Sequence, residues 1–106
     1  MKLTPIEENI MIKLWSLEEA TVNQLLDLFQ EPKPAFNTVS TQIRILEKKK
    51  IVRHKKSGRG YIYVPKISME EYQKELVNHI VDNYFEGSRN DLISYLSSNR
   101  SLSDLL

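Results

Sequence analysis

The feature that most constrains the fold of this 106-residue chain is a β-hairpin pattern between residues 51 and 65. β-Branched and aromatic residues, which favour strands, are frequent in the runs 51–56 and 61–65. The four residues that join these runs include Gly58 and Gly60, which can adopt the positive φ angles of a hairpin loop. The flanking segments have helical periodicity instead, so the sequence predicts helices around one hairpin.

Two helices are predicted before a proline-rich turn. The first spans about residues 5–17, where Thr4 and Glu7 form a capping box and apolar residues recur at helical spacing. A short extended element at about residues 18–22 follows, and Thr21 caps the second helix. Two prolines in the next segment cannot lie inside a helix, and they therefore end it.

A third helix follows this turn, and its two faces differ. Four apolar residues fall within a sector of about 80° and are expected to face the core: Phe36, Val39, Ile43 and Leu46. The opposite face is polar: Asn37, Thr41, Arg44 and Lys48. Asparagine, serine and threonine are poor helix formers, so their number in this helix indicates a role other than helix formation.

The predicted order is helix, short extended element, helix, turn, helix and hairpin, which is the winged variant of the helix-turn-helix. The predicted fold class is mainly α (α+β), with a winged helix-turn-helix DNA-binding domain at residues 1–66. A C-terminal helical dimerisation region is predicted at residues 67–106. It contains a fourth helix that begins after Ser68 and ends near Gly87, and a fifth helix capped by Ser88.

The net charge of +1 hides a strong asymmetry along the chain. Residues 44–66 contain nine lysines and arginines against the single anion Glu47, a local charge of +8, so the remainder carries −7. Such a local field favours a polyanionic partner. The helix dipole accounts for lysines 48–50 at the end of the third helix, but it does not account for the cations of the hairpin.

These features predict binding to double-stranded DNA, with the third helix as the recognition helix. Short polar side chains let a helix approach base edges, and arginine can bind guanine through two hydrogen bonds. The predicted base-contacting residues are Asn37, Thr38, Ser40, Thr41 and Arg44. The predicted phosphate-contacting residues are Lys48, Lys49, Arg53, Lys55, Lys56 and Arg59.

Simpler interpretations exist for several of these residues. Asn37 can be the N-cap of its helix, and the hydroxyl residues that follow it can be incidental surface residues. Lysines at the edge of a hairpin can serve only to discourage aggregation. Tyr61 and Tyr63 are expected to pack in the core rather than to stack on bases.

The fourth helix has a wide apolar arc, which predicts a dimer because two copies of a domain can read a two-fold operator. The predicted dimerisation residues are Tyr72, Leu76, Ile80, Tyr84, Leu92, Ile93 and Leu96. The alternative is that this helix folds back to complete its own core. His79 is interpreted as an interface or core imidazole.

Composition argues against several other classes of function. The chain has no cysteine and only two histidines, far apart in sequence, so neither a metal site nor a cofactor is expected. It lacks nucleophile motifs and phosphate-binding glycine loops, so an enzyme is not expected. No apolar run approaches the roughly 20 residues of a membrane span, and no leader is evident. A cytoplasmic location without membrane insertion is therefore expected.

Several blocks of sequence together carry a family resemblance: Leu3-Thr4-Pro5, Ala20-Thr21-Val22, PKPAFNTV at 32–39, RILEKK at 44–49 and GYIY at 60–63. In one register from residue 3 to about residue 102, the chain resembles the BlaI/MecI/CopY penicillinase repressor family. The resemblance implies a homodimeric winged-helix repressor of inverted-repeat operators, which controls β-lactamase-type or related stress genes. It also implies dimer contacts in the C-terminal helices and induction through a membrane-bound sensor metalloprotease.

Three features depart from the pattern of that family. The absence of cysteine removes the metal-binding tail of its copper-responsive members. Tyr95-Leu96 stands where β-lactam-responsive members have the Asn-Phe of the cleaved bond. Lys50 stands where the family has a glycine after the third helix, which implies either a different cap or a strain of about 1 kcal/mol.

The fold alone does not decide between DNA binding and another use of winged helices. The alternative function is a protein-interaction module that does not bind DNA. A docking module is expected to expose an apolar or acidic third helix, whereas this helix exposes small polar and basic side chains.

Overall fold

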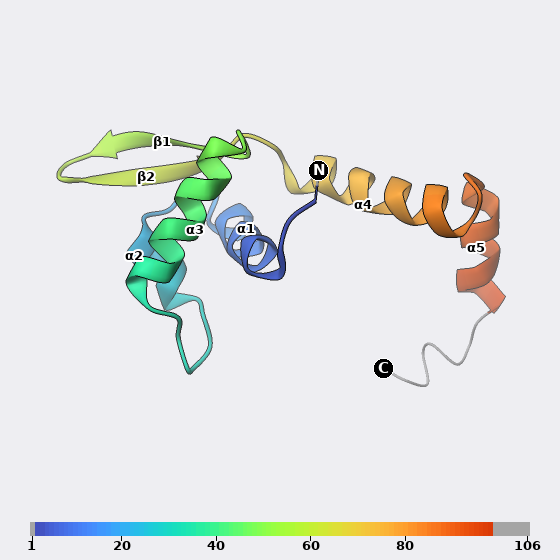
Figure 1. Cartoon of the computed structure of the whole chain (residues 1–106), viewed down its shortest axis with the longest axis horizontal. Coiled ribbons are helices and arrows are strands. Elements are labelled where there is room, and N and C mark those ends of the chain that lie inside the picture. The colour runs from blue at the N-terminus through green and yellow to red at the C-terminus, as the bar shows by residue number, and fades with distance from the viewer. Residues whose placement is uncertain (1, 99–106) are drawn as a thin grey trace. The chain divides into compact units, whose positions relative to one another are not determined.

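The computed structural model describes residues 2–98, and the chain divides into two compact units, residues 1–69 and 70–106. The first unit contains α1 (Pro5–Leu17), α2 (Val22–Asp27), α3 (Phe36–Lys48), β1 (Val52–Ser57) and β2 (Gly60–Pro65), and the second contains α4 (Met69–Tyr84) and α5 (Arg89–Ser98) (Figure 1). The last eight residues of the region predicted for dimerisation lie outside the described residues.

The helices α1 and α2 begin where the sequence predicts, after the N-cap residues Thr4 and Thr21. The Thr4 hydroxyl accepts a hydrogen bond from the Glu7 amide at 3.2 Å, and the Glu7 carboxylate accepts one from the Thr4 amide at 2.8 Å. Thr21 and Gln24 form the same reciprocal pair at the start of α2. At six residues α2 is too short to be stable alone, so burial of Leu25 in the core holds it in place.

The core of the first unit lies between α1, α2, α3 and the hairpin. Its fully buried side chains come mainly from the apolar faces of the helices: Ile10, Met11, Leu14, Leu25, Val39, Ile43 and Leu46. The short extended element before α2 pairs through Ala20, whose amide and carbonyl bond Tyr63 of β2 at 3.0 and 2.8 Å. The indole of Trp15 donates to the Ile67 carbonyl at 2.9 Å, which ties the segment after the hairpin to α1.

Phe36 is an exception to the predicted buried face of α3. Val39, Ile43 and Leu46 are fully buried, whereas 46% of Phe36 is exposed, so that prediction was wrong. Phe36 is the first residue of α3. Because helical side chains lean toward the N-terminus, a residue in this position extends beyond the packed turns of the helix.

The hairpin is tighter than the predicted four-residue loop. Ser57 pairs with Gly60, which leaves a two-residue turn of Gly58 and Arg59, and Gly58 has a φ of 60°. The turn end reaches past α3, away from the three helices (Figure 1). Tyr63 is therefore buried near the base, whereas 46% of Tyr61, two residues closer to the turn, is exposed. The prediction that Tyr61 packs in the core was wrong because the core ends before it.

Lys50 adopts the left-handed conformation that its place in the sequence indicates, with a φ of 64°. The Lys50 amide donates to the Glu47 carbonyl and the Ile51 amide to the Leu46 carbonyl, both at 3.0 Å. These two bonds define a Schellman motif, which usually has glycine at the position of Lys50. α3 therefore ends in an ordinary Schellman cap, and Lys50 has the backbone strain of a left-handed residue other than glycine.

Lys50→Gly is expected to stabilise the protein by about 0.5–1 kcal/mol. Relief of left-handed strain, about 1–2 kcal/mol, exceeds the cost of the greater freedom of glycine in the unfolded chain. Urea unfolding measures the change. The matched control is Lys48→Gly, at the last helical residue of α3, which should destabilise by up to about 1 kcal/mol. A loss of stability in Lys50→Gly would contradict the assignment of strain.

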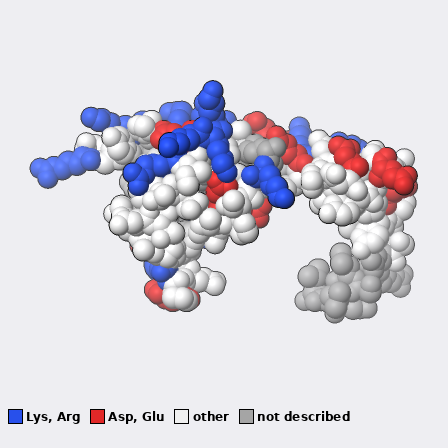
Figure 2. Space-filling model, viewed as in Figure 1, with Lys and Arg blue, Asp and Glu red and all other residues white. Residues whose placement is uncertain are grey.

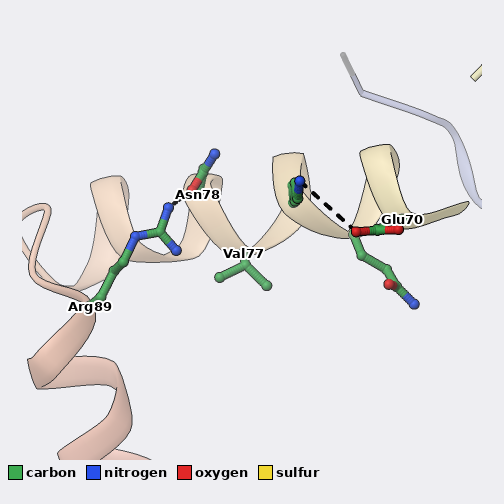
Figure 3. Close-up of a pocket in the computed structure, with 6 residues that line it drawn as sticks. Glu70, Val77, Asn78 and Arg89 are labelled. Atoms are coloured by element: carbon green, nitrogen blue, oxygen red, sulfur yellow. Dashed lines mark hydrogen bonds and ion pairs between the residues drawn. The ribbon is translucent and has the colours of Figure 1, made fainter. Parts of the chain in front are cut away.

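The second unit is a pair of helices with its own contacts. Val81 is buried, and the Phe85 ring lies 5.6 Å from the Tyr95 ring of α5. The Ser88 hydroxyl accepts a bond from the Asp91 amide at 3.1 Å and caps α5, as predicted. The Arg89 guanidinium donates to the Asn78 side-chain oxygen at 2.5 Å, beside Val77 in a hollow of about 350 Å³ (Figure 3).

The predicted dimerisation residues differ in exposure. Tyr72 is buried within the single chain and Leu92 is half-buried. The other five are exposed and are together called the α4–α5 apolar stripe here: Leu76, Ile80, Tyr84, Ile93 and Leu96. His79 is exposed and bonds Asn83 one turn away, so it is not a core imidazole of the single chain. Across residues 2–98 no helix combines the length and the apolar character that crossing a membrane requires.

Candidate nucleic-acid interface

The outward face of α3 presents the residues that the sequence assigns to base contact. Asn37, Thr38, Thr41 and Arg44 are exposed, and Ser40 is half-buried. The N-cap is Ala35, and no side chain caps the first turn. The interpretation of Asn37 as an N-cap was therefore wrong, because Asn37 is the second residue of the helix and lies within its first turn.

Arg44 is oriented by its own helix. Its Nε donates to the Ser40 carbonyl at 3.2 Å, one turn earlier. This bond uses one of the five N–H groups of the guanidinium. The N–H groups on the two terminal nitrogens can therefore still donate to a ligand, while the Nε bond orients the side chain.

The cations predicted to contact phosphate fall into two groups. Within residues 2–98, Lys48, Arg53, Lys56 and Arg59 are exposed and form no ion pair. Lys55 pairs with Glu19 at 2.8 Å, and Lys49 pairs with Glu7 at 2.7 Å. Figure 2 shows lysines and arginines gathered over the hairpin and the adjoining end of α3.

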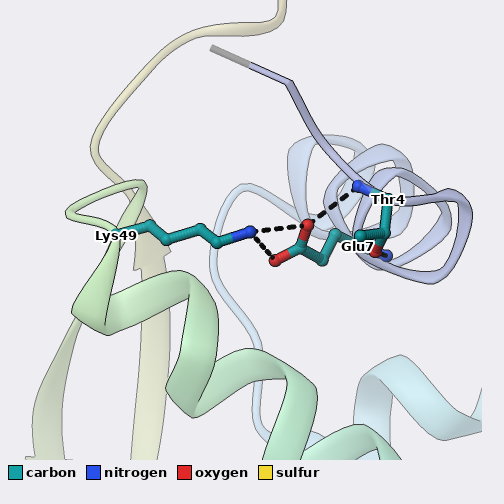
Figure 4. Close-up of polar contacts among 3 residues, drawn as sticks. All are labelled: Thr4, Glu7 and Lys49. Atoms are coloured by element: carbon teal, nitrogen blue, oxygen red, sulfur yellow. Dashed lines mark hydrogen bonds and ion pairs between the residues drawn. The ribbon is translucent and has the colours of Figure 1, made fainter.

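Lys49 forms an internal contact that the sequence-based prediction missed. Its ammonium bonds both oxygens of the Glu7 carboxylate, at 2.7 and 3.0 Å, and Glu7 is only 1% exposed (Figure 4). Burial by itself would raise the pKa of Glu7, but hydrogen bonds from Lys49 and Thr4 outweigh it, and the pKa is lowered. The pair fastens the end of α3 to the start of α1.

A sequence signal for this pair existed. Glu7 precedes Ile10, Met11 and Leu14 at intervals of three, four and seven residues, which places it on the buried face of α1. A buried carboxylate requires a cation or several hydrogen bonds. The capping box accounts for one of its oxygens only, so a distant cation was to be expected.

His54 and Glu47 join the hairpin to α3. The His54 ring, on β1, bonds the Glu47 carboxylate through Nδ1 and lies 4.6 Å from the Tyr61 ring in an edge-on arrangement. Glu47 is the single anion of the basic segment, so this bond directs it away from the outward face of α3. Burial, followed by the nearby charge of Glu47, raises the pKa of Tyr63. The bond between His54 and Glu47 thus joins the hairpin to α3.

Comparisons with known proteins agree with this architecture. The sequence profile of the penicillinase repressor family matches residues 3–105. The penicillinase repressor of Bacillus licheniformis is 22% identical over 103 residues, which cover 96% of this chain and 80% of that protein. The solution structure of the DNA-binding domain of the repressor BlaI has a TM-score of 0.58 and 24% identity, over 67% of this chain and 88% of that one.

A crystal structure described as a possible transcriptional regulator for arsenical resistance has a TM-score of 0.51 and 21% identity. It covers 74% of this chain and 86% of that chain. Both structural likenesses confirm the winged-helix fold, and the profile match over nearly the whole chain confirms the family resemblance. The chain therefore belongs to the penicillinase repressor family and is a transcriptional repressor, not an enzyme.

Proposed function

We propose that this repressor acts as a homodimer on inverted-repeat DNA operators, with α3 in the major groove and the hairpin at the adjacent minor groove. The observation that carries the proposal is the outward face of α3, which is polar, exposed and bordered by cations that form no ion pair within the described part of the chain. An apolar or acidic face would instead favour docking to another protein. Held by Glu47 and His54, the helix and hairpin present that face together.

Base contacts are assigned to Asn37, Thr41 and Arg44, with Thr38 on the flank of the same face. Arginine suits guanine and asparagine suits adenine, each through two hydrogen bonds. Phosphate contacts are assigned to those predicted cations that form no ion pair within residues 2–98: Lys48, Arg53, Lys56 and Arg59. Lys55 joins them, because exposed pairs such as Lys55–Glu19 contribute about 1 kcal/mol at most and can exchange partners.

The α4–α5 apolar stripe supports the homodimer. Its five residues are between 40% and 74% exposed in the single chain. Leu76, Ile80 and Tyr84 lie on one side of α4 at spacings of four residues. Apolar side chains gathered in this way mark an interface, and a second copy of the stripe would bury them.

Family membership supports three further proposals. The protein acts in the cytoplasm, it controls β-lactamase-type or related stress genes, and a membrane-bound sensor metalloprotease is its inducing partner. Tyr95 and Leu96, which stand in place of the Asn-Phe of sensitive members, are 45% and 57% exposed on α5. Incubation of the repressor with a sensor protease, followed by mass determination, tests cleavage at this bond.

Selection of bound duplexes from a random pool tests the operator proposal. We expect enrichment of an inverted repeat whose half-sites are separated by about 10 base pairs, centre to centre, or by a multiple of that spacing. Sedimentation of the complex should give two chains per duplex. Recovery of unenriched sequences would contradict sequence-specific binding, and no retention of DNA at low salt would favour the protein-docking alternative.

Arg44→Ala and Lys56→Ala are expected to separate base from phosphate contact. Arg44→Ala should weaken the selected operator by about 1–3 kcal/mol and relax the preference at one position of each half-site. Lys56→Ala should weaken operator and random duplex by similar factors and reduce the slope of log affinity against log salt by about 1 per subunit. Fluorescence anisotropy titrations measure both effects. Equal losses of Arg44→Ala on both duplexes would contradict its assignment to a base.

A further inference from the structure

A hollow lies between α3 and the hairpin, and the repressor contacts assigned above leave it without a role. Its volume is about 300 Å³. Three elements line it: Thr21, Val22 and Asn23 at the start of α2; Phe36 and Ser40 on α3; and Gly60, Tyr61 and Tyr63 on β2. Phe36 and Tyr61, each 46% exposed, both border this hollow.

The geometry of duplex DNA identifies what such a hollow receives. The major and minor grooves are separated on each side by one sugar–phosphate strand. A protein that places a helix in one groove and a hairpin in the next must let that strand pass between them. The hollow occupies that seam, since α3 forms one wall and β2 the other.

We propose that this seam binds the sugar–phosphate strand between the two grooves, with Tyr61 as its main contact. This inference rests on the proposed DNA binding. The apolar rings of Tyr61 and Phe36 suit the deoxyribose, and the neutral donors of Tyr61, Ser40 and Asn23 suit phosphate oxygens. Ser40 is then a backbone contact rather than a base contact, in agreement with its half-buried position on the flank of α3.

The charges around the hollow fit a strand of DNA. Lys56 is directly opposite Tyr61 in the hairpin register, and Arg59 precedes Gly60 at the turn. On α3, the exposed Arg44 lies one turn beyond Ser40 and donates to the Ser40 carbonyl at 3.2 Å. Cations therefore flank a lining that is itself neutral, which is the arrangement expected where a polyanion is guided past apolar sugar contacts.

Neutral contacts predict a particular response to salt. Tyr61→Ala should weaken binding to operator and random duplex alike, by about two- to tenfold, which is the range for one or two hydrogen bonds. The slope of log affinity against log salt should stay unchanged, because a neutral side chain releases no counterions. Tyr61→Phe, which keeps the ring, and Asn23→Ala should give smaller losses of the same kind.

Anisotropy titrations at several salt concentrations measure these changes. The matched control is Ile12→Ala, which removes an equally exposed apolar side chain on α1 outside the hollow and should bind as wild type. Far-UV circular dichroism and urea unfolding show whether each variant is folded. If Tyr61→Ala does not fold, the same titrations on Tyr61→Phe and Asn23→Ala test the proposal.

Duplexes with single methylphosphonates locate the contact. Neutralising the phosphate that faces the seam should weaken wild type and should weaken Tyr61→Phe less at that position, because the hydroxyl contact is already absent. Unchanged DNA affinity of the folded seam variants overturns the proposal. A loss of affinity confined to the operator also overturns it, and so does a loss accompanied by a smaller slope of log affinity against log salt. If wild type binds no duplex, the proposed function fails; if wild type binds and the seam variants match it, only this inference fails.

Discussion

Lys49→Met should lower the free energy of unfolding by about 3 kcal/mol at neutral pH, the largest stability effect expected for a single exposed lysine of this chain. The substitution leaves the Glu7 carboxylate buried without its cation, and breaking a buried pair from one side costs about 3–5 kcal/mol. The low end applies because the Thr4 amide still donates to Glu7. Urea unfolding measures the change.

The stability of wild type and the stability of Lys49→Met should depend on pH in opposite directions over the range where Glu7 titrates. In wild type the pKa of Glu7 is lowered, so the stability that its charge contributes is present above the unfolded pKa and is lost as the pH falls through the folded pKa. Without Lys49, burial dominates and raises the pKa of Glu7, so protonation at low pH relieves the buried charge. The difference in stability between wild type and Lys49→Met should therefore shrink below about pH 4.

Two further variants make the prediction specific. Adding Glu7→Gln to Lys49→Met removes both charges but keeps an oxygen that can accept from the Thr4 amide, so most of the lost stability should return. Lys48→Met, on the neighbouring exposed lysine, should change stability by less than about 0.5 kcal/mol. Equal stability of Lys49→Met and wild type would show that the ion pair contributes nothing. An unchanged salt slope for DNA binding in Lys49→Met would confirm that Lys49 holds the fold rather than phosphate.

Ile80→Asp should have the largest effect on DNA binding. An aspartate at the centre of the α4–α5 apolar stripe would be buried without a partner in a homodimer, at a cost of several kcal/mol. The monomer can engage only one half-site, so operator affinity should fall by about a hundredfold or more. Sedimentation and anisotropy measure the two losses. Affinity for an isolated half-site should stay at the wild-type value.

Asn78→Asp is the matched control for Ile80→Asp. It adds the same charge to the same helix, but Asn78 lies on the opposite side of α4 and its partner Arg89 can keep a hydrogen bond with aspartate. This variant should remain dimeric and should bind the operator as wild type. Dimerisation of Ile80→Asp at micromolar concentration would refute the assignment of the stripe.

Features that depend on neighbours in the chain could be predicted from the sequence. Thr4 and Thr21 cap their helices as predicted, because each bonds a residue three positions away that backbone geometry brings close. Lys50 adopted the left-handed conformation because the Schellman motif that ends α3 requires it at that position. Three of the four residues predicted on the buried face of α3, Val39, Ile43 and Leu46, also followed from spacing alone.

The extent of the core could not be predicted in this way. Periodicity shows which face of a helix or strand is apolar, but not how far along it the neighbouring elements extend. Phe36 lies on the face of α3 that is buried from Val39 onward, and Tyr61 lies two residues before Tyr63, which is buried. Both lie beyond the end of the packed elements, and this exposure is what makes them available to border the seam.

The sequence by itself determined the order of elements, the winged-helix class and the polar face of α3, since each depends on local periodicity, capping and turn residues. Only the tertiary structure decided which cations are free to meet DNA. Lys49 and Lys48 are adjacent in sequence, yet one is bound to a carboxylate 42 residues earlier and the other has no internal ion pair within residues 2–98. Such pairings depend on which elements meet in the folded chain, because charge acts through space rather than along the sequence.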